Sequence, residues 1–424
     1  MILLERLLKV AIILIPVIVI PWTGVTDQFY FPKAFVLWLI GISLLCWIVF
    51  KGGYTSIINL PKWLLIPIGV FLFAVLLSAS LSPHQQIVWD GLLWRHEGVY
   101  TLLCYILLFV LSANLNTVST TSIFDAIILT SSVVSLIGLL QYYNVQIIPQ
   151  DTLRYSWTRI YSTIGNANWL ASLLLLALPL TFYKASTSSN HFYKIALLLI
   201  SACLFATGSR GAYLALFIMA IAIILSKWNS LIRSSRKLIL PACVVLIGFS
   251  ITCIPNYYPL QRIYSTSTNI NSALVNNDMA AGEYRWHLFS EAVKMIPNYV
   301  FMGSGPDTFG KEFDQESTWH IMERDGIKKS HRVKILKAHN EYLQLAVTIG
   351  FLGSLSFIFI SYSIVFRLLR LRDWRSTAIA SGLLAYLIQL LFTNSSIGPA
   401  VVFWILLGIG VQKANSGLKK HIVR

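Results

Sequence analysis

The sequence predicts an all-α polytopic membrane protein with about 12 transmembrane helices and one large extracytoplasmic loop. Hydrophobic residues make up 56% of the 424 residues, charged residues only 12%, and the mean hydropathy is +0.69. This composition excludes an ordinary soluble protein. Apolar runs of about 16–25 residues recur along the chain, the length that a helix needs to cross a hydrocarbon core about 30 Å thick. Because the runs do not alternate with polar residues, they argue against a membrane β-barrel.

The apolar runs define twelve expected spans and a three-part organisation. The spans cover residues 5–21, 33–50, 62–80, 99–115, 122–142, 168–184, 192–207, 211–226, 238–255, 340–366, 376–394 and 399–413. Residues 1–255 therefore hold the first nine spans, residues 256–338 form the large loop, and residues 339–424 hold the last three spans and a tail.

Lys and Arg residues in the connecting segments predict the orientation, since cytoplasmic loops are enriched in them. With an even number of spans both termini share a side, and 18 of the 33 Lys and Arg residues fall on that side. Five fall in the short opposite loops, and the other ten lie in residues 256–338, a segment too long for the rule. We therefore expect cytoplasmic termini and an extracytoplasmic loop. The net charge of +16 then mainly reflects the Lys and Arg residues that orient the protein in the membrane. The sequence has no cluster of basic residues interleaved with aromatic ones, so it does not indicate a nucleic-acid partner.

One histidine lies where the large loop ends and the tenth span begins. His339 stands in the sequence Ala338-His339-Asn340-Glu341, at an expected membrane boundary where an ionisable group is costly unless it functions or is paired. A neutral imidazole titrates near physiological pH and can accept a proton from a hydroxyl. Alternatively, His339 is an inert group within a helix N-terminal arrangement.

Three arginines on the same expected side could bind an anion. Arg210 lies between Gly208 and Gly211, where an anion can approach closely and be gripped by two N–H groups; its alternative is snorkelling to lipid headgroups. Arg285 lies in an amphipathic segment, residues 284–293, which suits the membrane interface and could simply contact lipid. Arg95 either pairs with Glu97 or makes a further anion contact. We expect Pro297 to end the amphipathic helix.

No metal or cofactor site is indicated by the sequence. The five cysteines all fall within expected spans and form no CxxC pair, so they are expected to be small core residues. No Asp-rich cation site, Walker motif, Rossmann fingerprint, HExxH or GxSxG motif is present.

Together these residues resemble the O-antigen ligase and polymerase family, multi-spanning enzymes that transfer glycans from polyprenyl diphosphate carriers. Arg210 to Leu214 matches the R-x3-L pattern of the ligases, and His339 to Gly350 matches their H-x10-G pattern. Arg285 begins an R-x3-aromatic segment that resembles the family's second loop arginine, and the large loop precedes the histidine as in the family. The resemblance covers mainly residues 160–355.

The resemblance implies a GT-C-like helical fold and a metal-independent glycosyltransferase of the bacterial cytoplasmic membrane. His339 would be the general base, and Arg210, Arg285 and Arg95 would bind the diphosphate of an undecaprenyl or other polyprenyl diphosphate-linked glycan. The acceptor would be a glycolipid or polysaccharide hydroxyl on the extracytoplasmic face, as in lipopolysaccharide biosynthesis; a protein hydroxyl is also possible.

Two other functions stay open at this point. A polymerase of the same family would use the end of a second lipid-linked glycan as its acceptor. A secondary transporter would show internal repeats and polar groups near the middle of its spans, and the two halves of the chain show no convincing similarity.

Overall fold

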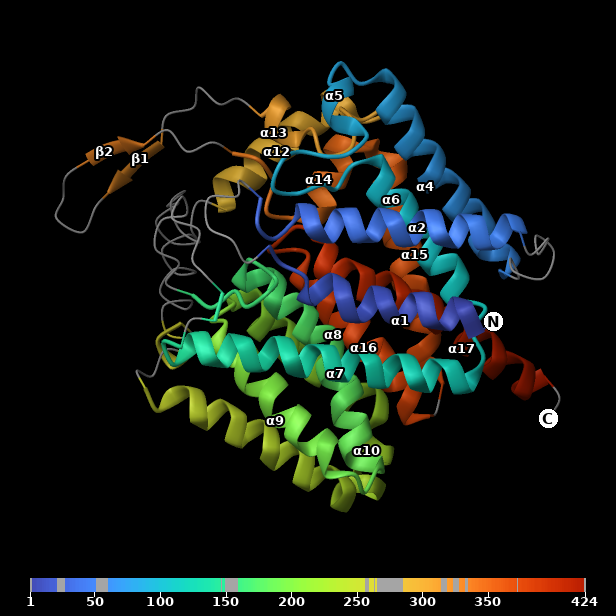
Figure 1. The fold of residues 1–424 in the computed structure, drawn as a ribbon, viewed down its shortest axis with the longest axis vertical. Coiled ribbons are helices and arrows are strands. Elements are labelled where there is room, and N and C mark those ends of the chain that lie inside the picture. Colours follow the sequence, from blue (N-terminus) through green and yellow to red (C-terminus); the bar gives the residue numbers. More distant parts are fainter. Residues whose placement is uncertain are drawn as a thin grey trace.

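The protein is a bundle of long helices with its two termini at one end and a small hairpin at the other (Figure 1). The computed structural model describes residues 2–20, 27–50, 60–145, 147–148, 159–255, 259–262, 264, 285–313, 319–322, 328–331, 335–371 and 373–422. Residue 284, the first of the expected amphipathic segment, lies outside the described residues.

Every expected span overlaps a helix, although the first, fourth and eleventh extend beyond their helices. The long helices are α1 (Ile2–Val17), α2 (Phe31–Phe50), α4 (Lys62–Leu81), α6 (Val99–Ser112), α7 (Thr117–Tyr142), α8 (Ala167–Thr187), α9 (His191–Ala206), α10 (Arg210–Cys253), α15 (Gly350–Arg370), α16 (Trp374–Gln389) and α17 (Ile397–Ile422). In the described part of the chain, 7 segments are long and apolar enough to cross a membrane, and three shorter apolar helices accompany them. The expected all-α polytopic membrane fold is confirmed; the GT-C likeness stays a prediction.

One expected span is divided, and two others fall within one element. The eighth and ninth expected spans both lie in α10, which consists of two helices that meet at a kink at Lys227, where the backbone is non-helical, directly after the expected end of the eighth span at residue 226. There the Lys227 ammonium donates to the carbonyls of Leu369 and Leu371 and so caps the end of α15. The tenth span is two helices, α14 (Glu341–Thr348) and α15, because Gly350 has a φ of +75° and breaks the helical path.

The segment between α10 and α14 carries short elements. The expected amphipathic helix is α12 (Arg285–Tyr299), which extends two residues past Pro297 rather than ending there. Its buried face packs with α13 (Phe309–Glu312) and α14 around a separate apolar cluster. The antiparallel strands β1 (Trp319–Met322) and β2 (Lys328–His331) form a hairpin that the sequence did not predict. The expected loop limits at 256 and 338 stay a prediction.

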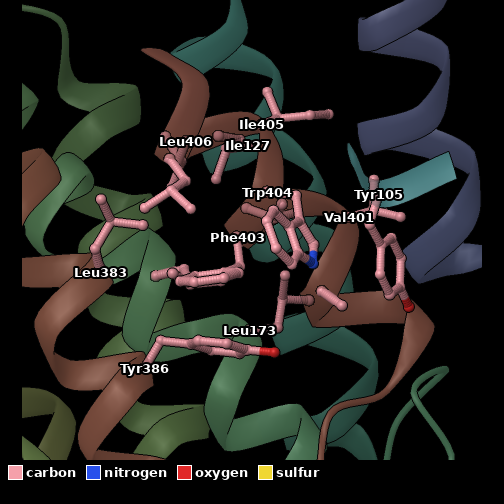
Figure 2. Close-up of a cluster of buried hydrophobic side chains, with 14 of the residues drawn as sticks. Tyr105, Ile127, Leu173, Leu383, Tyr386, Val401, Phe403, Trp404, Ile405 and Leu406 are labelled. Atoms are coloured by element: carbon pink, nitrogen blue, oxygen red, sulfur yellow. The ribbon is translucent and has the colours of Figure 1, made fainter. Parts of the chain in front are cut away.

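The bundle core forms around α17. Of the residues in its span, 89% are buried, against 22% in the second half of α10, which therefore lies at the periphery. Tyr386 of α16 stacks on Phe403 with ring centroids 4.6 Å apart, and Tyr105 of α6 stacks on Trp404 (Figure 2). The core therefore joins helices from both ends of the chain, as a single membrane bundle requires.

Candidate active site

His339 occupies a sharp turn directly before α14. Its φ is +55°, in the left-handed region that non-glycine residues rarely adopt. The next residue, Asn340, is the N-cap of α14 and accepts a hydrogen bond from the Leu343 N–H at 3.2 Å. The capping group is therefore the Asn340 amide, and the His339 imidazole does not serve as the cap.

Cationic side chains from separate parts of the chain act electrostatically on the His339 imidazole. Burial lowers the pKa of His339 well below its usual value, and the positive charges of Lys337, Arg285 and Arg95 lower it further. The imidazole is consequently neutral at physiological pH. The fold thus brings His339 together with two of the three arginines chosen from the sequence, and adds Lys337.

Arg210 is the first residue of α10 and lies beside the end of α16. Gly211 leaves no room for a side chain, since a Cβ there would lie 2.5 Å from the Gln389 Oε1 atom and 2.9 Å from Phe392. The Gln389 amide donates to the Ser209 hydroxyl at 3.1 Å. The following residue, Leu390, accepts a hydrogen bond from the Glu341 N–H at 2.9 Å. The turn before Arg210 and the turn at His339 are therefore attached to adjacent residues, Gln389 at the end of α16 and Leu390 directly after it.

Two further arginines hold the turn that precedes Arg210, and sequence reasoning missed both. The Arg159 Nε donates to the Thr207 carbonyl at 2.8 Å, and its Nη2 donates to the Asn168 Oδ1 atom at 2.9 Å. The Arg262 Nε donates to the Gly208 carbonyl at 3.1 Å. Arg159 and Arg262 lie outside the expected spans, where single arginines are common, so no motif distinguished them.

Arg95 is buried in an ion pair with Asp307. The Arg95 Nε lies 2.5 Å from the Asp307 Oδ1 atom, and both side chains are at most 5% exposed. The other Asp307 oxygen accepts from the Leu92 N–H at 2.8 Å and from the Glu97 N–H at 3.3 Å. Burial opposes the charge of Arg95, but Asp307, Glu97 and Glu341 outweigh this effect and raise its pKa. The close partner of Arg95 is therefore Asp307, although Glu97 contributes electrostatically.

Two further buried carboxyl groups, Glu97 and Glu341, interact electrostatically with Arg95 of this ion pair. Burial raises the pKa of Glu97 to about 8, although Arg95 counteracts part of the effect, so Glu97 is largely protonated at neutral pH. Glu341 is also buried, with 7% of its surface exposed. Both residues line a small cavity that reaches Tyr105 and Tyr386, two of the aromatic core residues in Figure 2.

The positions of Asp307, Glu341 and Lys337 could not be singled out from the sequence. Asp307 follows a glycine-rich turn, Gly303 to Pro306, where an acidic residue is ordinarily solvated. The backbone places Asp307 inward because the Ser304 and Gly305 N–H groups bond to carbonyls at the end of α14. Among the described residues, no group of three His, Cys, Asp or Glu side chains is placed to hold a metal ion.

Comparison with known proteins matches one segment of the chain to a protein family. Residues 195–358 match the family model described as O-antigen ligase. No curated protein matches the chain significantly. The matched segment contains Arg210, Arg285 and His339 and indicates a membrane protein that processes glycans. The resemblance to the O-antigen ligase family, predicted from the motifs, is therefore confirmed through residues 195–358.

Proposed function

We propose that this protein is a membrane glycosyltransferase of the O-antigen ligase type, which moves a glycan from a polyprenyl diphosphate carrier to an acceptor hydroxyl. The observation that carries the proposal is a neutral histidine, His339, in the positive field of Arg285, Arg95 and Lys337. Transfer from a diphosphate needs a base for the acceptor and positive charge for the leaving group in one place. The match to the O-antigen ligase family supports the same assignment.

The transfer is a substitution at the anomeric carbon of the donor sugar. The acceptor oxygen forms the new bond to that carbon while the bond to the diphosphate oxygen breaks, and the diphosphate leaves with the bonding electrons. His339 takes the acceptor proton, and the anomeric configuration inverts. No metal is required in this scheme, because guanidinium groups can stabilise the leaving diphosphate by bidentate hydrogen bonds.

Arg210 and Arg285 are the proposed diphosphate ligands. Arg210 is held at the N-terminus of α10, where the helix dipole also favours an anion. Arg285 starts α12, which packs directly on α14 next to His339. Arg95 is a weaker candidate for direct contact, because its guanidinium already pairs with Asp307; it would contribute mainly through its charge.

Donor binding would also activate the base. Without the donor, the cations around His339 make proton acceptance unfavourable. A bound diphosphate brings negative charge into the same space, which counteracts the cations and raises the pKa of His339. His339 would therefore become an effective base only when the donor is in place.

The proposed location is the bacterial cytoplasmic membrane, with both termini cytoplasmic and the active site on the extracytoplasmic face. The excess of Lys and Arg on the side of the termini supports this orientation. The two termini lie at one end of the bundle, and the hairpin that precedes His339 lies at the other (Figure 1). Membrane lipids and the polyprenyl tail of the donor would contact the apolar outer faces of the helices.

The experiment that tests this function uses purified protein in liposomes with a polyprenyl diphosphate-linked glycan. Lipid A core and a second lipid-linked glycan would be supplied as separate acceptors, and the products resolved by mass. One addition to a distinct acceptor indicates a ligase, whereas a ladder of repeats indicates the polymerase alternative. Arg210→Lys should weaken donor turnover about tenfold or more, since an ammonium cannot grip a diphosphate bidentately. Normal turnover by Arg210→Lys contradicts the bidentate role.

A further inference from the structure

The strained turn at His339 is held from both sides by side chains that the proposed reaction does not use. Before the turn, the Ala338 N–H donates to the Gln344 Oε1 atom at 2.9 Å. After the turn, the Glu341 Oε2 atom accepts from the Ser395 N–H at 2.8 Å. The turn is therefore fixed to α14 at its beginning and to the α16–α17 loop, residues 390–396, at its end.

One buried amide connects these two attachments. The Asn394 Nδ2 atom lies 3.3 Å from the Glu341 Oε2 atom and 3.3 Å from the Gln344 Oε1 atom, and donates to both. The residue is only 1% exposed. A primary amide has two N–H donors on one nitrogen, which suits two acceptor oxygens that lie on either side of the His339 turn.

Asn394 is itself held in place by a third part of the chain. Its backbone carbonyl accepts a hydrogen bond from the Trp169 indole of α8 at 2.9 Å. The Lys337 ammonium lies over the same Trp169 ring, 4.2 Å from the centroid. Asn394 therefore joins α8, α14 and the α16–α17 loop around the residues that precede and follow His339.

We propose that Asn394 is a positioning residue. Its amide holds the Glu341 and Gln344 oxygens at fixed positions relative to each other and thereby fixes the direction of the His339 imidazole. This role rests on the proposed function of His339 as general base. An aspartate in this place would lack both N–H donors and would put a carboxylate against two acceptor oxygens. The nearly isosteric change Asn394→Asp therefore removes the connection while changing the volume little.

Kinetics and histidine chemistry together test the proposal. For Asn394→Asp in liposomes we expect a kcat about 100-fold lower, since small displacements of a catalytic group have effects of this size, while the KM for the lipid-linked donor stays within about threefold. The rate at which diethyl pyrocarbonate modifies His339, followed by peptide mass spectrometry, should rise several-fold as the turn is released. Gln344→Met, which removes the acceptor, should act in the same direction, and Gln344→Glu, which keeps acceptor oxygens, should retain more activity.

Asn116→Ala is the matched control, because it also removes one amide hydrogen bond. In that bond the Asn116 Oδ1 atom accepts from the Ser119 N–H at 2.7 Å and caps the N-terminus of α7. The Ser119 hydroxyl in turn donates to Glu5 of α1. Asn116→Ala should leave both kcat and the modification rate unchanged. If a folded Asn394→Asp variant keeps the wild-type kcat or the wild-type modification rate of His339, the proposal is overturned. A parallel loss of kcat and of donor affinity also overturns it.

The modification rate of His339 does not depend on turnover. If wild-type protein makes no product but the rate still rises in Asn394→Asp, the proposed function fails while the structural connection holds.

Discussion

Arg95 and Asp307 form a buried ion pair, with 2.5 Å between the Arg95 Nε and the Asp307 Oδ1 atoms. The pair joins the loop before α6 to the turn after α12, two segments far apart in the sequence. It places a positive charge close enough to His339 to lower the pKa of that histidine. The ion pair therefore contributes to the electrostatics of the proposed active site as well as to the fold.

Breaking the ion pair from one side should destabilise the protein strongly. Asp307→Asn leaves the Arg95 charge buried without its carboxylate, and loss of one partner of a buried pair typically costs about 3–5 kcal/mol. We expect a clear fall in the unfolding temperature in detergent. The double variant Arg95→Met/Asp307→Leu should recover part of the loss, because no lone charge is left buried. A single variant as stable as wild type contradicts this account of the pair.

The activity should depend on pH differently in the free enzyme and in the donor complex. His339 must be neutral to accept a proton, so activity is lost as the pH falls through the pKa of His339. That pKa lies well below the usual value in the free protein, so kcat/KM should persist well below pH 6.5. In the complex the diphosphate raises the pKa, so kcat should decline at a higher pH than kcat/KM.

Lys337→Gln provides the check on this pH dependence. Removing the cation should raise the pKa of free His339, so that the acidic decline of kcat/KM moves to higher pH. An unchanged acidic limb in Lys337→Gln, or a wild-type kcat/KM that already declines above pH 6.5, would mean that another group controls the rate.

Glu97 should make the folded state less stable as the pH rises toward 8. The carboxyl group loses its proton near the ordinary value of 4.5 when the chain is unfolded, but only near a pKa of about 8 when it is folded. Between these values the folded state binds more protons, so its stability falls with increasing pH. Glu97→Gln should flatten this decline in unfolding temperature between about pH 5 and 8. An identical decline in the variant would assign it to other groups.

A side chain at Gly350 should destabilise the protein. Its φ is +75°, and a Cβ would lie 3.2 Å from the carbonyl oxygens of Val300 and Phe301. Gly350→Ala should therefore lower the unfolding free energy by about 1–2 kcal/mol. Gly69→Ala in α4 is the matched control, because a Cβ there meets nothing within 4 Å; that change should be neutral or slightly stabilising. Equal stability of the two variants contradicts the prediction.

The helices could be predicted from the sequence because each apolar run is long enough to cross a bilayer and must form its hydrogen bonds internally. The break at Gly350 could not, because its conformation depends on contacts with the end of α12. His339, Arg210 and Arg285 were recognisable from their motifs and their places beside apolar spans. Asp307 and Asn394 were not, because each gains its role only from partners that are distant in the sequence.

Loss of transfer in His339→Ala is the most direct test of the central claim. The measurement is single-turnover transfer from a polyprenyl diphosphate-linked glycan by reconstituted wild-type and variant protein at equal amounts and with equal unfolding temperatures. General-base catalysis contributes about 10²–10⁴ in rate, so the account predicts a loss of at least 100-fold with donor binding retained. Transfer by His339→Ala at a rate near that of wild type would contradict it.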